Sequence, residues 1–339
     1  MKKLITLFCV LGLLSIHAQE GELDFSFNGT GKILYENSNF AEARSVLIQP
    51  DGMILTGGYI FYNQGDLLVA RFDRNGNPDV TFATQGFAYI DLNTEWQRVN
   101  DMQLLPDGKI MLLAETDHNG ERGCALVRLT ADGFLDQTFA DSGWVFNGIG
   151  YGTTYWNALV QLPGGDLVAG GYIYHSNQVQ MALLGYHPNG DLNLNFGDTG
   201  VALKSVGGTT TELHALKVTA DGKIMAGGTS FFQGNRGLML IRYEANGQVD
   251  MSFAGGNGIT IGFNDDAELR DICFQRDGKI LAAVFVERSN DDLFAMARVT
   301  SSGTLDPGFG TNGKVETAIG RDSRAAFVGV LGDDRIILG

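Results

Sequence analysis

A five-residue pattern that returns at an almost fixed interval constrains this chain more than any other feature. Its first copy is Leu23–Phe27, and further copies begin at Pro78, Leu135, Leu192, Val249 and Leu305. The second residues of successive copies are 55, 57, 57, 57 and 56 residues apart. Self-similarity at one period indicates a single supersecondary unit repeated along the chain. We therefore divide the chain into units that start near residues 23, 78, 135, 192, 249 and 305.

Two further markers keep the same register. A turn sequence such as Asp51-Gly52 leads into a β-rich run, and an arginine such as Arg71 ends a later apolar run. The repeat markers are Asp51, Arg71, Asp79, Asp107, Arg128, Asp136, Asp221, Arg242, Asp250, Asp277, Arg298 and Asp306. The third unit has Gly164, Gly185 and Asn193 at these positions. Because cation and anions are lost together, we interpret them as a structural ion pair. Either Asp51 or Asp79 can be the partner of Arg71.

Each unit is predicted to form four β-strands, which in the first unit are Lys32–Glu36, Ala43–Gln49, Met53–Phe61 and Asp66–Asp73. No stretch has a sustained helical period, and the 47 glycines interrupt the chain too often for long helices. Four antiparallel strands per repeat are typical of β-propeller blades, whereas solenoid coils are usually shorter, at roughly 20–47 residues. We predict an all-β propeller of about six units within residues 19–339 as a single domain. The sixth unit ends at Gly339 before its fourth strand, so we expect a longer natural chain.

The order of these markers resembles a known repeat. Leu-Asp-x-Ser-Phe followed by glycine, then an Asp-Gly-Lys-Ile turn and a strand that ends in arginine, is similar to the delta-60 repeat of secreted bacterial proteins. The resemblance extends from Leu23 to the end and implies a β-propeller exported across the cell envelope. Such chains often also carry a type IX secretion sorting domain. The resemblance implies no particular activity.

The first 18 residues have the layout of a secretory signal peptide. Lys2 and Lys3 precede the apolar run Leu4–Ile16, and Ala18 is a small residue suited to cleavage. A run of 13 apolar residues is too short to cross a hydrocarbon core about 30 Å thick. We expect a protein that the export machinery delivers outside the cell or to the outer cell surface, with no membrane span.

Composition and motif spacing exclude several functions. The net charge of −15 argues against nucleic acid as a partner. No spacing typical of a metal site, a phosphate-binding loop or a nucleophile elbow occurs, so we predict no metal, no cofactor and no catalytic residue. Cys124 and Cys273 lie in different units and are interpreted as small buried side chains.

Strand alternation predicts that the Asp-Gly turns lie on one face of the domain and the segments of variable sequence on the other. Function usually resides in variable segments on a rigid scaffold. The variable segments joining the third and fourth strands include 115–123 and 230–237. The candidate ligand-binding residues on this face are Tyr62, Trp96, His118, Trp156, Tyr174 and Phe232. Aromatic side chains there are suited to an extracellular glycan or protein partner, or alternatively cover blade edges.

Three functions follow from this interpretation. The first is a non-catalytic binding or adhesion scaffold that uses the variable face. The second is a propeller-type hydrolase or lyase acting on polysaccharide. The third is an architectural spacer in a larger surface protein.

Overall fold

The computed structural model describes residues 23–34, 40–61, 65–150, 152–175, 178–208, 210–289, 291–319 and 324–339. The predicted signal peptide and Tyr62 lie outside these ranges. The described residues form an all-β chain whose helical content is one 3-10 turn, Ala254–Gly256. Across the same ranges, no helix has both the length and the apolar character that a membrane span requires.

Twenty of the strands form five antiparallel sheets of four, which we call blades 1 to 5. Blade 1 contains β1 (Ala41–Ile48), β2 (Ile54–Ile60), β3 (Asp66–Phe72) and β4 (Phe87–Ile90). Blade 2 contains β5 (Trp96–Leu104), β6 (Ile110–His118), β7 (Glu121–Leu129) and β8 (Trp144–Asn147). Blade 3 contains β9 (Thr154–Gln161), β10 (Leu167–His175), β11 (Gln178–Tyr186) and β12 (Val201–Lys204).

The remaining strands follow the same order. Blade 4 contains β13 (Thr211–Val218), β14 (Ile224–Phe232), β15 (Asn235–Tyr243) and β16 (Ile259–Ile261). Blade 5 contains β17 (Asp266–Phe274), β18 (Ile280–Glu287), β19 (Leu293–Val299) and β20 (Lys314–Thr317). A two-stranded sheet of β21 (Val328–Val330) and β22 (Ile336–Leu338) packs against blade 5.

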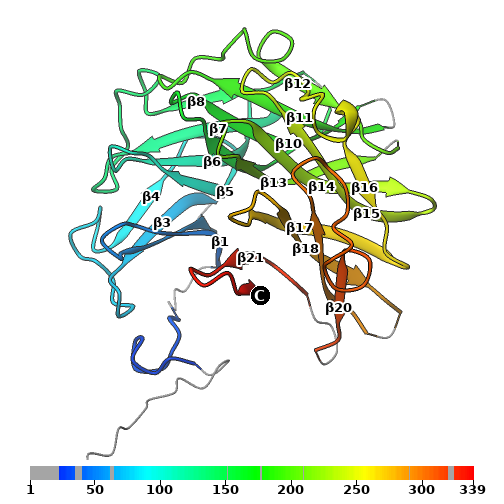
Figure 1. The fold of residues 1–339 in the computed structure, drawn as a ribbon. Helices are drawn as coiled ribbons and strands as arrows, with labels where there is room; N and C mark the ends of the chain where they lie inside the picture. Colours follow the sequence, from blue (N-terminus) through cyan, green and yellow to red (C-terminus); the bar gives the residue numbers. More distant parts are fainter. Residues whose placement is uncertain are drawn as a thin grey trace, which may run out of the picture.

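The sheets are arranged as an open fan around a common centre (Figure 1). The first strand of each sheet is innermost, because β1, β5, β9, β13, β17 and β21 contact one another in that order. Hydrophobic clusters fill the space between neighbouring sheets. Within the described ranges the sheets do not close into a ring. The structure therefore shows four-stranded antiparallel blades, but not a count of six.

The blades are offset by one strand from the sequence units. The strand that follows each five-residue pattern pairs with the preceding sheet: Phe87–Ile90, at the start of the second unit, is the outer strand of blade 1. The described part of the strand predicted at Lys32–Glu36 is residues 32–34, and these residues are not in a strand. The sequence period is the same whether the chain is divided into sequence units or into blades, and only strand pairing shows which division is the structural one.

Side chains and a close backbone approach fasten each inner strand to its neighbours. The amide of Asn100 donates to the carbonyl oxygen of Trp156 in the next blade at 2.7 Å, and Asn157 donates in the same way to Leu213 at 2.7 Å. A β-bulge in β9 brings the carbonyl oxygen of Tyr155 so close to Gly171 that a Cβ there would lie 1.9 Å from it. These contacts join neighbouring inner strands side by side.

The repeated arginines pair with the second of the two aspartates. Arg71, Arg128, Arg242 and Arg298 each place Nε 2.5 to 2.8 Å from the carboxylate eight residues downstream. Each guanidinium also covers the phenylalanine ring of the five-residue pattern, at 4.4 to 5.1 Å. In three of them Nη1 reaches a backbone carbonyl of the next blade, as Arg128 does at Pro188. The pair therefore links two blades.

In three of the units the first aspartate has a different partner. Asp51, Asp107 and Asp277 accept hydrogen bonds from backbone N–H groups two residues downstream, within their own turns. In the third unit Asp166 takes over part of the connection, because it accepts a hydrogen bond from Asn193 at 3.0 Å and lies 3.3 Å from His187. The ring of Phe196 fills the space where a side chain at Gly185 would begin.

The expected variable loops are shorter than the sequence suggested. Most of 115–123 and 230–237 is paired strand, and the turns are reduced to Asn119-Gly120 and Gln233-Gly234. Both residues of each turn have positive φ, from 53° to 95°, which is the conformation of a tight two-residue hairpin. Sequence variation on this face therefore falls on strand ends rather than on long loops.

Candidate functional site

Tyr62 lies outside the described residues, and the structure does not bring the other five candidate residues together. Trp156 is fully buried between blades 2 and 3, so its assignment as a surface ligand contact is wrong. Trp156 lies beside the β-bulge of β9, and its side chain packs in the hydrophobic cluster between blades 2 and 3. His118 packs against Trp144 and Phe146 near the outer strand of blade 2. Phe232 is half-buried at the end of β14. Of the described candidates, Trp96 and Tyr174 belong to one connected group of side chains.

That group begins in blade 2 with a buried carboxylate held by two arginines. Glu115 is fully buried and accepts hydrogen bonds from Arg98 at 2.9 Å and Arg122 at 2.5 Å. Both guanidinium groups lie 4.8 Å from the ring of Trp96. Asn100 also donates to Glu115 at 3.2 Å. Because Glu115 is buried and bonded to both arginines, it holds their guanidinium groups in fixed positions.

The group continues into blade 3 through aromatic contacts. The guanidinium of Arg122 lies 4.6 Å from the ring of Tyr155, which stacks on Tyr172 at 4.9 Å with an interplanar angle of 20°. Tyr174 makes T-shaped contacts with both rings, with ring centroids 5.9 and 6.0 Å apart, and is 46% exposed. Burial raises the pKa of Tyr172 and Tyr174, with nearby Glu212 adding to the shift. The hydroxyls of Tyr172 and Tyr174 are therefore neutral hydrogen-bonding groups at physiological pH.

Blades 4 and 5 supply the other end of the group. Arg236 donates to Glu212 at 2.8 Å and also to Glu268, and Glu268 accepts from Arg270 at 2.7 Å. His214 packs edge-on against Tyr172 at 6.3 Å, and its Nε2 lies 3.7 Å from Glu212 without a hydrogen-bond partner among the described residues. Burial, together with Arg270 and Arg236, lowers the pKa of His214 to about 3, so the imidazole is neutral.

We call the whole set the axial band, and its members are Trp96, Arg98, Glu115, Arg122, Tyr155, Tyr172, Tyr174, Glu212, His214, Arg236, Glu268 and Arg270. Its arginine, glutamate and tyrosine groups offer both hydrogen-bond donors and acceptors beside aromatic rings. Sequence analysis missed most of it. Aligning the repeats could have revealed part of this set. One aligned position of the inner strands is polar or aromatic in four units, where it holds Arg98, Tyr155, Glu212 and Glu268.

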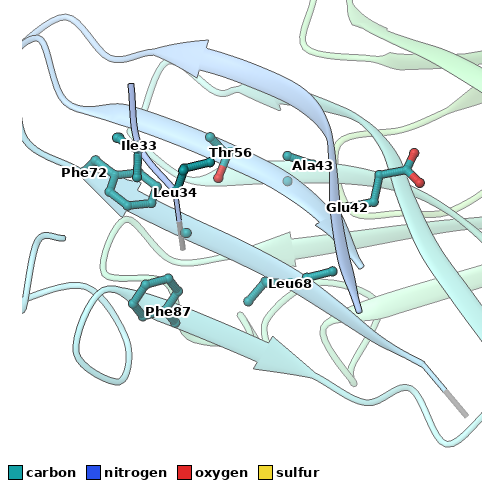
Figure 2. Close-up of a pocket in the computed structure, with 12 residues that line it drawn as sticks. Ile33, Leu34, Glu42, Ala43, Thr56, Leu68, Phe72 and Phe87 are labelled. Atoms are coloured by element: carbon teal, nitrogen blue, oxygen red, sulfur yellow. The ribbon is translucent and has the colours of Figure 1, made fainter. Parts of the chain in front are cut away.

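A hollow with a volume of about 340 Å³ lies on the side of blade 1 that no other blade covers (Figure 2). Leu68, Phe72 and Phe87 line it on the sheet, and the segment with Ile33 and Leu34 passes over it. Val46 on this side is 62% exposed, whereas its counterpart Met102 is 2% exposed because blade 1 covers it. The hollow therefore lies on the face of blade 1 whose equivalent in blade 2 is covered by the preceding blade.

Comparison with known proteins agrees with this architecture. Residues 49–82, 105–139, 219–253 and 275–309 match the profile of a family described as "Domain of unknown function (DUF5122) beta-propeller". The chain carries β-propeller repeats. Each matched segment contains the Asp turn, the arginine and the five-residue pattern, and the third unit, which lacks the ion pair, is outside the match. No curated protein matches the chain significantly.

Solved structures give weaker similarities. The crystal structure of polysaccharide lyase Uly1 has 11% identity and a TM-score of 0.49, over 94% of this chain and 79% of that one. A polysaccharide lyase of family PL25, an ulvan lyase bound to a saccharide, has 9% identity and a TM-score of 0.48, over 87% and 72%. At these identities and TM-scores, neither structure bears on what this chain binds or catalyses.

Proposed function

We propose that this protein is a non-catalytic binding scaffold that holds an extracellular ligand over the axial band. The single observation that carries the proposal is the band itself, a continuous series of aromatic and paired charged side chains across blades 2 to 5. The opposite ends of the same strands carry the repeated ion pairs and turns, which are explained by packing alone.

The band is well suited to binding because it is held in place before a ligand arrives. Its residues lie on inner strands and strand ends, and Asn100 and Asn157 tie adjacent inner strands together. Side chains that are already ordered lose less conformational entropy on binding. Ion pairs and ring contacts within the band restrict the arginines further, since each guanidinium has a carboxylate or ring neighbour.

The proposal includes a place outside the cell. The pattern Met1–Ala18 supports export, and the acidic composition agrees with a glycan or protein partner rather than nucleic acid. We also propose that the repeats are of the delta-60 type and that β21 and β22 begin a sixth blade, since they follow the register of the earlier units.

The test is a binding assay on an array of oligosaccharides and purified extracellular proteins. The variant R122A/R236A removes two arginines of the band, and R276A removes an arginine from the opposite end of the blades, where its side chain is 69% exposed. We expect the double variant to lose about tenfold or more in affinity and R276A to change it by less than about twofold. Equal binding by all three proteins would refute the assignment of the band, provided that thermal unfolding shows the double variant folded.

One observation favours a second candidate function, a propeller-type polysaccharide hydrolase or lyase. Burial raises the pKa of Glu212, and the neutral His214 imidazole lies 3.7 Å away. A carboxyl of raised pKa beside a neutral imidazole is a possible proton donor and acceptor pair. Release of shortened oligosaccharides by the wild-type protein, lost in E212Q, would support this function over the scaffold.

A further inference from the structure

The further inference rests on the proposed function and concerns the ligand class. Blade 3 differs from its neighbours at three equivalent strand positions. They hold Tyr155, Tyr172 and Tyr174 in blade 3, whereas blade 2 has Arg98, Glu115 and Asp117 and blade 4 has Glu212, Thr229 and Phe231. Packing of the repeat does not require tyrosine at these positions, because the other blades form the same strands without it.

The three tyrosines are part of a stack that crosses three blades. The guanidinium of Arg122 lies between two rings, 4.8 Å from the centroid of Trp96 and 4.6 Å from that of Tyr155. The series continues from Tyr155 to Tyr172, with ring centroids 4.9 Å apart, and from Tyr172 to His214, with ring centroids 6.3 Å apart. Tyr155 and Tyr172 stack on each other, whereas Tyr172 and His214 make a T-shaped contact. Tyr174 makes T-shaped contacts with Tyr155 and Tyr172 and remains 46% exposed, so it is the ring offered to a ligand.

Charge around this ring is balanced. Arg98 and Arg122 both form ion pairs with Glu115. A second carboxylate, Asp117, is paired across the sheet with Trp96 on one neighbouring strand and with Arg122 on the other. On the other side, Arg236 and Arg270 are matched by two carboxylates, Glu212 and Glu268. His214 is neutral, because burial and the two arginines of blades 4 and 5 lower its pKa to about 3.

Balanced charge disfavours an ionic ligand. An anion would have to compete with carboxylates already 2.5 to 2.9 Å from the guanidinium groups, and a cation would meet arginine on either side. A hydroxyl group can instead donate to the carboxylate and accept from the guanidinium of one pair without displacing either. A ring that is apolar on its face and hydroxylated at its edge fits both the exposed tyrosine ring and its polar surroundings.

We infer that the tyrosine cluster of blade 3 binds an uncharged sugar ring, stacked on Tyr174, with its hydroxyl groups between Arg122 on one side and Glu212 on the other. The ligand class is therefore a neutral oligosaccharide or polysaccharide. Phe231 does not serve the same purpose, although it occupies the equivalent position of blade 4 and is 47% exposed, because it lies outside the tyrosine stack.

The experiment measures affinity for neutral xylo-, manno- and cello-oligosaccharides and for oligogalacturonate, at about 0.05 and 0.5 M NaCl. The variants are Y174A and Y155A, with F231A as a control matched in position and exposure. We expect a neutral oligosaccharide to bind with little dependence on salt, with a loss of about tenfold or more in both tyrosine variants and less than about twofold in F231A.

Several results would overturn this inference. Binding of oligogalacturonate alone, weakened by salt, would show that the ligand is anionic, and the binding scaffold itself would stand. Equal affinity in Y174A and wild type would place the sugar elsewhere. Binding of a protein but no oligosaccharide, lost in R122A/R236A, would refute the sugar and leave the proposed function intact. Loss in F231A equal to that in Y174A would remove the special role of blade 3.

Discussion

The ion pair between Arg128 and Asp136 gives a sharp test of how the blades are fastened. Arg128 Nε lies 2.7 Å from Asp136, whose side chain is 6% exposed and which also accepts from Lys109 at 3.0 Å. The arginine donates further to the carbonyl oxygen of Pro188 in blade 3 at 3.1 Å. These donors, with the hydrogen bonds from Thr138, hold the pKa of Asp136 well below its usual range despite burial.

Breaking a buried pair by removing one partner typically costs about 3–5 kcal/mol. For D136N we expect about 3 kcal/mol, because Asn keeps the hydrogen bonds to Thr138 and Arg128 keeps Pro188. For R128A we expect about 2 kcal/mol, because Lys109 remains beside Asp136. The double variant should cost about 3 kcal/mol rather than the additive sum of about 5, since neither partner is then left unpaired. The third unit, with Gly185 and Asn193, is a natural example of this double loss.

The assay is urea unfolding followed by far-UV circular dichroism, with the free energy of unfolding extrapolated to water for the four proteins of the cycle. A control is N193A in the third unit, where the side chain has lost the arginine partner and we expect a cost below about 1 kcal/mol. If the double variant were additive within about 0.5 kcal/mol, the two residues would not act as a pair, and the structural explanation of the repeat markers would be refuted.

Two further predictions concern buried residues. Burial raises the pKa of Asp101 to about 6, so the stability that this carboxyl contributes is fully present below about pH 4 and is lost as the pH rises through 6, by roughly 3 kcal/mol. Unfolding measured from pH 4 to 7 should show this loss as the difference between the wild type and D101N, and identical pH profiles would contradict it. Trp156→Ala removes a fully buried side chain, so we expect a loss of about 3–5 kcal/mol in the free energy of unfolding, whereas an unchanged thermal midpoint would show that the ring is not in the core.

Several features of the fold could be predicted from the sequence. The repeat of the five-residue pattern, the Asp-Gly turns and the absence of a helical period were sufficient for an all-β chain of four-stranded sheets, because each is a local property of the chain. The joint loss of Arg and Asp in the third unit indicated an ion pair. It did not identify the partner, since Asp51 and Asp79 occur with equal regularity and only the turn geometry shows that Asp51 bonds its own backbone.

The candidate site was harder to predict for two physical reasons. Two-residue turns such as Asn119-Gly120 extend the strands to the edge of the sheet, so the variable positions lie at strand ends and not on loops. A β-bulge in the first strand of each four-stranded sheet then changes which side chains point inward. Trp156 turns into the core, and Tyr155 beside it joins the stack.

The sequence by itself determined the local elements of this protein: its period, its strands, its turns and the spacing of its ion-pair residues. These depend on backbone propensity and on residues fewer than ten positions apart. Only the tertiary structure decided which strand completes which sheet and which side chains meet around the axis. Arg122 contacts Tyr155 in the next blade, and Tyr172 contacts His214 in the blade after that. These contacts exist because the inner strands of successive blades, which are far apart in the sequence, pack side by side. A repeat unit carries no local signal for such a contact, since it forms between units rather than within one.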